Sequence, residues 1–225
     1  MHTEVLREAP LFSGLDDEAA EALSASMVEH RLMRGEVLFR EGDEGDQLYV
    51  MTDGKVKLGR TSADGRENLL AILGPGQMFG ELSLFDPGPR SATATAVTDC
   101  TMQSLAHDEL GRWLDGRPEV ARGLLVQLAV RLRKANDVVA DLVFSDVPGR
   151  VAKALLDLSS RFGRVGDDGI HVHHDLTQEE LAQLVGASRE TVNKALADFA
   201  SRGWLRLEAR SVVLMDVERL KRRVR

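Results

Sequence analysis

The chain has 225 residues, of which 43% are hydrophobic, so a packed core is feasible and wholesale disorder is excluded. Its formal net charge of −7 argues at first sight against binding to nucleic acid. The charge is unevenly distributed, because residues 1–145 balance to −9 and residues 146–225 to +2. The C-terminal part is therefore mildly basic, and the objection does not extend to it.

The single cysteine, Cys100, excludes a disulfide framework within one chain and any four-cysteine metal cluster. Apolar stretches such as residues 124–130 are much shorter than the ~18 residues that a membrane-spanning helix needs. The N-terminus is charged and no long apolar run follows it, so no secretory signal is predicted. We expect a soluble, cytoplasmic protein with no membrane partner.

The first thirty residues are expected to form short helices, since acidic residues at 16–18 precede apolar residues at helical spacing. From about residue 31 to 106 the pattern changes to short apolar or alternating runs, at 37–39, 48–51, 56–58 and 69–73. Short strands separated by Gly/Asp turns predict a β-barrel or sandwich. The pairs Asp53-Gly54 and Asp64-Gly65 predict tight hairpins, because glycine accepts positive φ without steric cost.

Residues 118–144 are predicted to form one long helix with an apolar seam. The seam positions are Ala121, Leu125, Leu128, Leu132, Ala135, Val139 and Leu142. Their alternating spacing of four and three residues is a heptad pattern, which favours a parallel dimer of two such helices. The alternative is an amphipathic helix that packs on its own barrel.

The segment Asp146-Val147-Pro148-Gly149 is predicted to break this helix, because proline cannot continue it and glycine frees the backbone. A further helix, a Gly/Asp-rich turn at 163–169 and an alternating segment at 170–173 are expected to follow. The predicted domains are a barrel at residues 1–117, the long helix at 118–145 and a C-terminal domain at 146–225.

Two short helices joined by a glycine turn are predicted within residues 176–196. Thr177 with Glu180 three residues later forms a capping box that starts the first helix. Gly186 ends it after about two turns, and Ser188 can cap the second helix. The second helix is expected to bury apolar residues and to direct a polar face outward, as in a helix-turn-helix. The alternative is a helical hairpin with a solvated charged face.

The outer face of the second helix suits the major groove of DNA. Arg189 can donate two hydrogen bonds to guanine, Glu190 can accept one from cytosine, and Lys194 can reach a base or a phosphate. The candidate DNA-binding residues are Thr177, Gln178, Ser188, Arg189, Glu190, Thr191, Asn193 and Lys194.

A small hairpin, or wing, is predicted from the apolar runs 204–207 and 212–215 that follow the helix pair. Its residues Arg206 and Arg210 could contact phosphates. The basic tail at 219–225 is as consistent with a solvated helix end as with DNA contact.

Residues 79–94, in the β-rich part, combine a glycine-bearing turn, one acid, one arginine and several hydroxyls. Backbone N–H groups at a short helix start can hold an anion, and Arg90 can grip a phosphate through two charge-assisted hydrogen bonds. Glu81 can accept hydrogen bonds from a sugar hydroxyl. The alternative, which spacing alone does not exclude, is a surface loop with an ordinary Arg–Glu pair.

These motifs resemble a known family. Gly80-Glu81-Leu82 followed by Pro89-Arg90-Ser91-Ala92 resembles the phosphate-binding cassette of cyclic-nucleotide-binding domains. The segments Asp146–Arg150 and Val185–Val192 resemble the hinge and recognition helix of the cyclic-AMP receptor protein (CRP)/FNR family of bacterial regulators, and most closely those of its actinobacterial branch.

The resemblance implies an α+β protein with an N-terminal jelly-roll-like barrel for cyclic AMP, a long dimerisation helix and a C-terminal winged helix-turn-helix. The homodimer would bind a palindrome of double-stranded DNA with GTG-type half-sites, and RNA polymerase would be a further partner. The implied ligand-binding residues are Gly80, Glu81, Leu82, Ser83, Arg90, Ser91, Ala135 and Asn136. The implied seam is Leu125, Leu128, Leu132, Ala135, Val139 and Leu142.

Two residues depart from the family pattern. Ala135 stands where a hydroxyl residue commonly bonds the adenine, so Asn136 beside it would have to take over, and "cyclic nucleotide" is a firmer prediction than "cyclic AMP". Lys194 stands where better-known members have arginine, and lysine contacts guanine less rigidly.

Three alternative interpretations fit the sequence less well. A redox or haem sensor of the same superfamily would leave the Gly80–Ser91 set unexplained, and iron–sulfur members need several cysteines. A metal enzyme would need more than His171, His173 and His174, so we expect neither a metal site nor enzyme activity. A nucleotide-binding regulatory protein that acts on a protein partner would not need residues 146–225.

Overall fold

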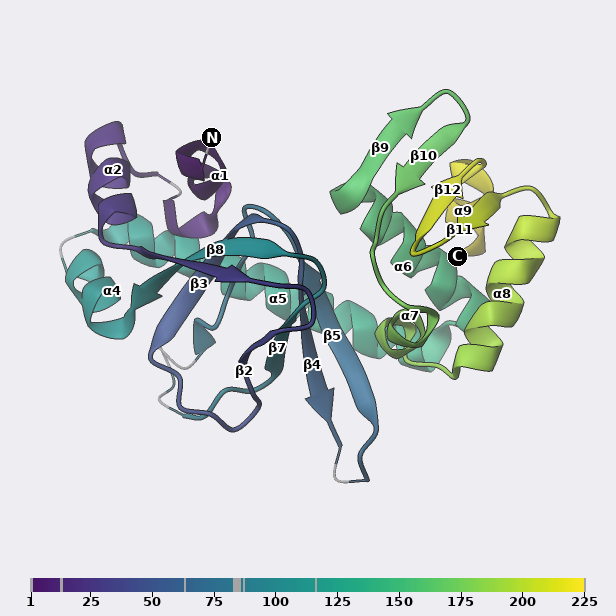
Figure 1. Cartoon of the computed structure of the whole chain (residues 1–225), viewed down its shortest axis with the longest axis horizontal. Coiled ribbons are helices and arrows are strands. Elements are labelled where there is room, and N and C mark those ends of the chain that lie inside the picture. Colours follow the sequence, from purple (N-terminus) through teal and green to yellow (C-terminus); the bar gives the residue numbers. More distant parts are fainter. Residues whose placement is uncertain are drawn as a thin grey trace. The chain divides into compact units, whose positions relative to one another are not determined.

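Figure 1 shows the computed structural model of the chain, which describes residues 2–12, 14–62, 64–82, 86, 88–115 and 117–224. The chain divides into two compact units, Met1–Thr61 with Leu70–Lys134 and Ser62–Leu69 with Ala135–Arg225. Within the described ranges no helix is both long enough and apolar enough to cross a membrane.

The N-terminal residues form the predicted short helices, α1 (His2–Glu8), a 3-10 turn η1 (Pro10–Phe12) and α2 (Asp17–Ala25). The carboxylate of Asp16 caps α2 by accepting a hydrogen bond of 2.8 Å from the backbone N–H of Ala19. This capping satisfies a donor that the first turn of a helix leaves free.

The described strands of the first unit form two four-stranded sheets, in the orders β1-β8-β3-β6 and β2-β7-β4-β5 (Figure 1). The strands are β1 (Val28–Leu32), β2 (Val37–Phe39), β3 (Gln47–Asp53), β4 (Val56–Thr61), β5 (Glu67–Leu73), β6 (Met78–Phe79), β7 (Thr93–Ala96) and β8 (Cys100–Ala106). All four predicted strands are confirmed. Except for β4 and β5, strands that are adjacent in the sheets are far apart in the chain, which gives the jelly-roll-like β domain.

One of the two predicted hairpins is wrong. Asp64-Gly65 does join neighbouring strands, β4 and β5, with Gly65 at φ +81°. Asp53-Gly54 instead carries the chain from one sheet to the other, since β3 pairs with β6 and β8 while β4 pairs with β5 and β7. A Cβ on Gly54 would lie 2.3 Å from the carbonyl oxygen of Asp99, so this glycine permits a close approach to the β7–β8 turn.

The core of the first unit lies in two clusters. One joins the N-terminal helices, the sheet of β3 and β8, helix α4 (His107–Leu114) and the start of the long helix, through residues such as Leu23, Leu105 and Leu124. The other lies between the two sheets and contains Tyr49 and Phe79, whose rings stack with centroids 5.3 Å apart. The two residues of β6, Met78 and Phe79, belong to the first and the second cluster respectively. Both clusters therefore fix the end of β6, where the cassette begins.

Helix α5 (Pro118–Phe144) confirms the long helix over its full predicted length. The predicted break of this helix is confirmed at Asp146, the first residue of the predicted segment, whereas Pro148 and Gly149 already lie in the first turn of α6 (Val147–Phe162). Proline is tolerated there, since the N–H groups of a first turn have no partner within the helix. Asp146 is the N-cap of α6, so the two helices are separated at Ser145 and Asp146.

The C-terminal residues form the helix pair α7 (Gln178–Val185) and α8 (Arg189–Ser201) and a sheet in the order β11-β12-β10-β9. The wing is confirmed as β11 (Leu205–Glu208) and β12 (Ser211–Leu214). The predicted turn at 163–169 is partly wrong, because Gly163–Gly166 is strand β9, paired with β10 (Gly169–Val172). Helix α9 (Val217–Arg223) ends the described chain.

Candidate functional site

The cassette begins where β6 ends, at Gly80. Gly80 has φ +81°, and a Cβ there would lie 2.8 Å from Nη1 of Arg90 and 3.0 Å from the carbonyl oxygen of Gln47. Both the backbone conformation and the lack of space therefore require glycine. This turn brings the backbone of Gly80 directly against the arginine of the cassette.

Arg90 is buried, with 5% of its surface exposed. Its Nη1 donates a hydrogen bond of 2.9 Å to the carbonyl oxygen of Gly80, and its guanidinium lies over the ring of Phe39 at 4.3 Å from the centroid. Its backbone N–H donates to the carbonyl oxygen of Asp43 at 2.7 Å. The side chain is therefore held by a ring face, a carbonyl and a fixed backbone, which leaves a preoriented cation in a weakly polar setting.

Glu81 is fully buried. One of its carboxylate oxygens accepts a hydrogen bond from Arg131 on α5, which also donates to the carbonyl oxygen of Met78. The other oxygen, Oε2, has no hydrogen-bond partner among the described residues. A buried carboxylate oxygen without a donor is costly, so this oxygen suits a ligand hydroxyl. The alternative of an ordinary surface pair is wrong, because Glu81 and Arg90 are both buried.

The helix pair α7–α8 has the predicted local chemistry. Thr177 and Glu180 make both hydrogen bonds of the capping box, and Gly186 ends α7 in the left-handed conformation at φ +69°. Ser188 caps α8 by accepting from the N–H of Thr191 at 3.2 Å. The buried residues of α8 are Val192, Ala195, Leu196 and Phe199.

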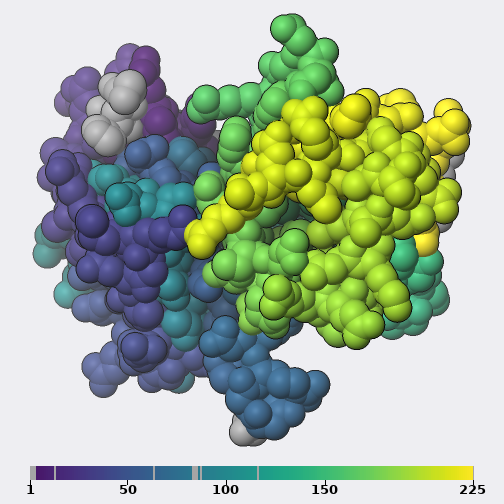
Figure 2. Space-filling view, turned by 45° about the vertical axis from the view of Figure 1, so that its right-hand side comes forward, coloured from purple at the N-terminus to yellow at the C-terminus, as the bar shows by residue number. Residues whose placement is uncertain are grey.

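The outer face of α8 carries most of the predicted contact residues. Arg189, Glu190 and Lys194 are exposed, and Lys194 lies 3.7 Å from Glu190. In the space-filling view, α8 and the residues that follow it form the surface coloured yellow-green to yellow (Figure 2). The outward orientation predicted for Asn193 is partly wrong, because this side chain is half-buried and its Oδ1 is shielded from solvent.

The two halves match two family models. The cyclic nucleotide-binding domain matches residues 29–116, and the Crp-like helix-turn-helix domain matches residues 149–223. The CRP-like cAMP-activated global transcriptional regulator of Mycobacterium tuberculosis is 55% identical over 222 residues, which cover 99% of each chain. This chain belongs to the CRP/FNR family. It is a DNA-binding transcription regulator whose DNA binding is modulated by a cyclic nucleotide, and it falls in the actinobacterial branch of the family.

Two further relatives extend the comparison. The cyclic AMP receptor protein of Thermus thermophilus is 39% identical over 217 residues, 94% of this chain and 97% of that one. The solved structure of the c-di-GMP-responsive global regulator of Xanthomonas campestris matches with a TM-score of 0.77 and 28% identity, over 88% of this chain and 99% of that one. These CRP/FNR relatives share the fold, but one is named for cyclic AMP and the other for c-di-GMP.

The other predicted ligand-binding residues of this CRP/FNR chain that the structure describes are exposed. Leu82 is 48% exposed and Ser91 is exposed, whereas Ser83 lies outside the described residues. Ala135 and Asn136 are exposed on α5, one helical turn beyond Arg131. Arg131 is absent from the predicted ligand-binding residues, because a lone arginine among polar helix residues, 50 positions after its partner, carries no motif.

Replacing Arg131 by methionine is expected to destabilise the barrel by about 3 kcal/mol, because the buried Glu81 carboxylate would lose its compensating charge. Urea unfolding of variants made in a Trp204→Phe background, where Trp113 is the single tryptophan, measures the loss by fluorescence. Glu81→Gln in the same background should restore part of it, since a neutral amide costs less to bury. The exposed Arg133→Met is the matched control, and an equally small effect at both positions would contradict the pairing.

The wing arginines of this CRP/FNR chain differ from each other. Arg206 is paired with Asp168 at 2.7 Å and Glu208 at 3.2 Å, and the hydrogen bonds from Arg206 and His171 lower the pKa of Asp168 to about 2. Arg210 is exposed at the β11–β12 turn with φ +58°. His174 is buried and its Nδ1 accepts a hydrogen bond from the N–H of Leu176, so this nitrogen is already engaged within the protein.

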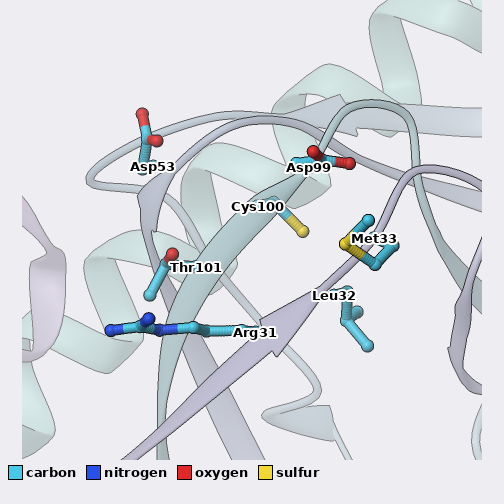
Figure 3. Close-up of a pocket in the computed structure, with 7 residues that line it drawn as sticks. All are labelled: Arg31, Leu32, Met33, Asp53, Asp99, Cys100 and Thr101. Atoms are coloured by element: carbon cyan, nitrogen blue, oxygen red, sulfur yellow. The ribbon is translucent and has the colours of Figure 1, made fainter.

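A pocket of about 220 Å³ lies elsewhere on the barrel, and Figure 3 shows the side chains that line it. They are Arg31, Leu32, Met33, Asp53, Asp99, Cys100 and Thr101. The pocket shares no residue with the cassette. Burial raises the pKa of the Cys100 thiol to about 11, so the thiolate that a reactive cysteine needs is scarce at neutral pH.

Proposed function

We propose that this regulator is a homodimer that binds cyclic AMP in each barrel and, in response, binds a palindromic DNA site. The observation that carries the proposal is the buried Glu81 carboxylate, whose Oε2 lacks a donor among the described residues; the preoriented cation of Arg90, held against the carbonyl oxygen of Gly80, adds to it. Arg90 and the backbone near Gly80 would hold the cyclic phosphate, and Glu81 would accept from the ribose hydroxyl. The M. tuberculosis and T. thermophilus relatives carry cyclic AMP in their names.

A second ligand remains a candidate because of one residue. Ala135 has no hydroxyl with which to bond an adenine, and the X. campestris relative is named for c-di-GMP. Loss of one hydrogen bond costs about 0.5–1.5 kcal/mol, which weakens binding or relaxes base selection without abolishing either. Asn136, the exposed neighbour, would then supply the polar contact to the base.

The proposed dimer rests on the exposed seam of α5. The apolar side chains of Leu125, Leu132, Val139 and Leu142 are 65%, 64%, 61% and 52% exposed in the single chain. A contiguous apolar stripe of this kind marks an interface, and its heptad spacing fits a parallel pair of helices.

Replacing Leu132 by glutamate is expected to convert the dimer to a monomer at micromolar concentration, because the seam would bury an unpaired carboxylate. Sedimentation equilibrium measures the association. Arg133→Glu, a neighbouring substitution off the seam, should leave the dimer intact. If the Leu132→Glu protein is still a dimer, α5 does not form the dimer interface.

DNA recognition is assigned to α8. Arg189 and Glu190 would read guanine and cytosine of a GTG-type half-site, and Lys194 would contact a base or a phosphate. In a two-fold dimer the half-sites would lie ~34 Å apart, about one turn of DNA. With chromosomal DNA and RNA polymerase as partners, the protein would act in the cytoplasm and would catalyse no reaction.

The test is fluorescence anisotropy on a labelled TGTGA-type palindrome at fixed salt, without nucleotide and with cyclic AMP, cyclic GMP or c-di-GMP. Tighter binding with cyclic AMP than with the others, and none of it on a scrambled duplex, is the expected result. If the affinity for the palindrome is specific but does not change with cyclic AMP, the protein is a DNA-binding regulator and cyclic AMP is not its ligand. No specific binding in any condition would favour action on a protein partner.

A further inference from the structure

The junction between α5 and α6 is held by side chains from both helices. Lys153 on α6 donates to the carboxylate of Asp141 on α5 at 2.5 Å. Arg150 donates to the carbonyl oxygen of Ser145 at 2.9 Å. Asp146 caps α6 through Oδ1, which accepts from the N–H of Gly149 at 2.9 Å. The junction is thus a defined joint with named contacts and is not a free glycine hinge.

The C-terminal helix α9 adds a contact from outside these two helices. Arg223, in its last turn, donates to Oδ2 of Asp146 at 2.5 Å, so the two oxygens of the cap are shared between α6 and α9. Leu220 is fully buried and anchors α9 to the unit. A Cβ on Gly149 would lie 3.0 Å from Oδ1 of Asp146, so glycine at this position makes room for the capping carboxylate. The carbonyl oxygen of Arg223 would lie 3.4 Å from the same Cβ, so the end of α9 reaches ordinary contact distance of the start of α6.

The same first turn of α6 leads to the DNA-reading helix pair. Arg150, one residue after Gly149, donates to the carbonyl oxygens of Val185 and Gly186 at 3.1 and 3.2 Å. Those carbonyls lie at the glycine turn that sets the angle between α7 and α8. A shift in the first turn of α6 would therefore reach the start of the recognition helix through one guanidinium.

We propose that Arg223 is a positioning residue for DNA binding, which clamps the N-cap of α6 and so holds the helix-turn-helix at a fixed angle to the end of α5. The proposal rests on the proposed function, because the angle matters when paired recognition helices must enter successive grooves. The hydrogen bond from Arg223 is the largest cause of the lowered pKa of Asp146, so the carboxylate is charged throughout the neutral range. The side chain of Asp146 is 61% exposed, so the clamp is weak enough to open.

The test compares four variants of the full-length protein: Arg223→Gln, Asp146→Asn, their combination, and the control Arg222→Gln. Asn caps a helix about as well as Asp, so Asp146→Asn keeps the cap while removing the charge that Arg223 binds. Arg222 is exposed and makes no ion pair with any described residue, so Arg222→Gln removes the same charge without the contact. Two measurements are made: hydrogen exchange without ligand or DNA, and anisotropy on the palindrome at saturating cyclic AMP.

We expect Arg223→Gln to speed amide exchange at residues 147–151 and 186–191 and to weaken palindrome binding about threefold to fivefold relative to Arg222→Gln. The double variant should bind no more weakly than either single one, because both remove the same contact. Unchanged exchange at 186–191, additive losses in the double variant, or palindrome affinity equal to the control would each overturn the proposal. If the affinity of the wild-type protein for the palindrome does not change with cyclic AMP, the proposed function fails. The rate of amide exchange at 186–191 in Arg223→Gln still tests whether Arg223 positions the helix pair.

Discussion

Replacing Arg90 by alanine is expected to lower affinity for cyclic AMP about 100-fold or more. The guanidinium would supply charge-assisted hydrogen bonds to the cyclic phosphate, each worth roughly 1.5–3 kcal/mol, and about 2.7 kcal/mol corresponds to 100-fold. The side chain is already oriented by Gly80 and Phe39, so little ordering offsets that gain. Isothermal titration with cyclic AMP measures the loss.

The Arg90 experiment needs two controls. Arg60→Ala removes a charge from the same barrel at an exposed pair with Glu41 and should bind cyclic AMP as wild type does. Sedimentation should show that the Arg90→Ala protein is still a dimer, because the seam lies on α5. An Arg90→Ala protein that binds cyclic AMP within threefold of wild type would move the phosphate site away from the cassette.

Replacing Arg189 by glutamine is expected to weaken binding to the TGTGA-type palindrome by about tenfold to 100-fold while changing affinity for a scrambled duplex little. Arg189 is exposed at the first position of α8, where a bidentate contact to guanine would be worth roughly 1–3 kcal/mol of discrimination. Anisotropy on duplexes substituted one base pair at a time gives the preference at each step. We expect preference to be lost at one guanine and kept at the others.

The control for Arg189 lies at the other end of the same helix. Arg202 follows α8 and is paired with Asp198, so Arg202→Gln removes the same charge far from the N-terminal contact face. Its effect should be uniform across sequences, since a charge without base contact alters only the salt-dependent part of binding. An Arg189→Gln protein with an unaltered preference would remove this residue from the reading face.

The elements most fully predicted from sequence are those set by local chemistry. The capping box of Thr177 with Glu180, the left-handed Gly186 and the cap at Ser188 are each decided within four residues, and all three are confirmed. The heptad pattern likewise predicted α5 from Pro118 to Phe144. Short-range hydrogen bonds and side-chain periodicity are visible in one sequence without knowledge of the fold.

The misses depend on contacts between distant residues. Asp53-Gly54 has the local signal of a hairpin, but that signal does not say which sheet the next strand joins. Arg131 and Glu81 meet across 50 positions, and the burial of both Glu81 and Arg90 follows from the packing of the sheets. Pro148 is expected to interrupt the helix, but proline is tolerated in the first turn of a helix. The break therefore lies at Asp146, the N-cap of α6, and Pro148 lies within α6.

We expect cyclic-nucleotide binding and DNA binding to be thermodynamically coupled in this chain, and the reciprocity of the two affinities tests this coupling most directly. Titration calorimetry would give the affinity for cyclic AMP in the presence of the specific palindrome and of a scrambled duplex at the same salt. Linkage requires that cyclic AMP bind more tightly with the palindrome, by the same factor by which cyclic AMP tightens palindrome binding. Equal affinity for cyclic AMP with both duplexes would contradict the account.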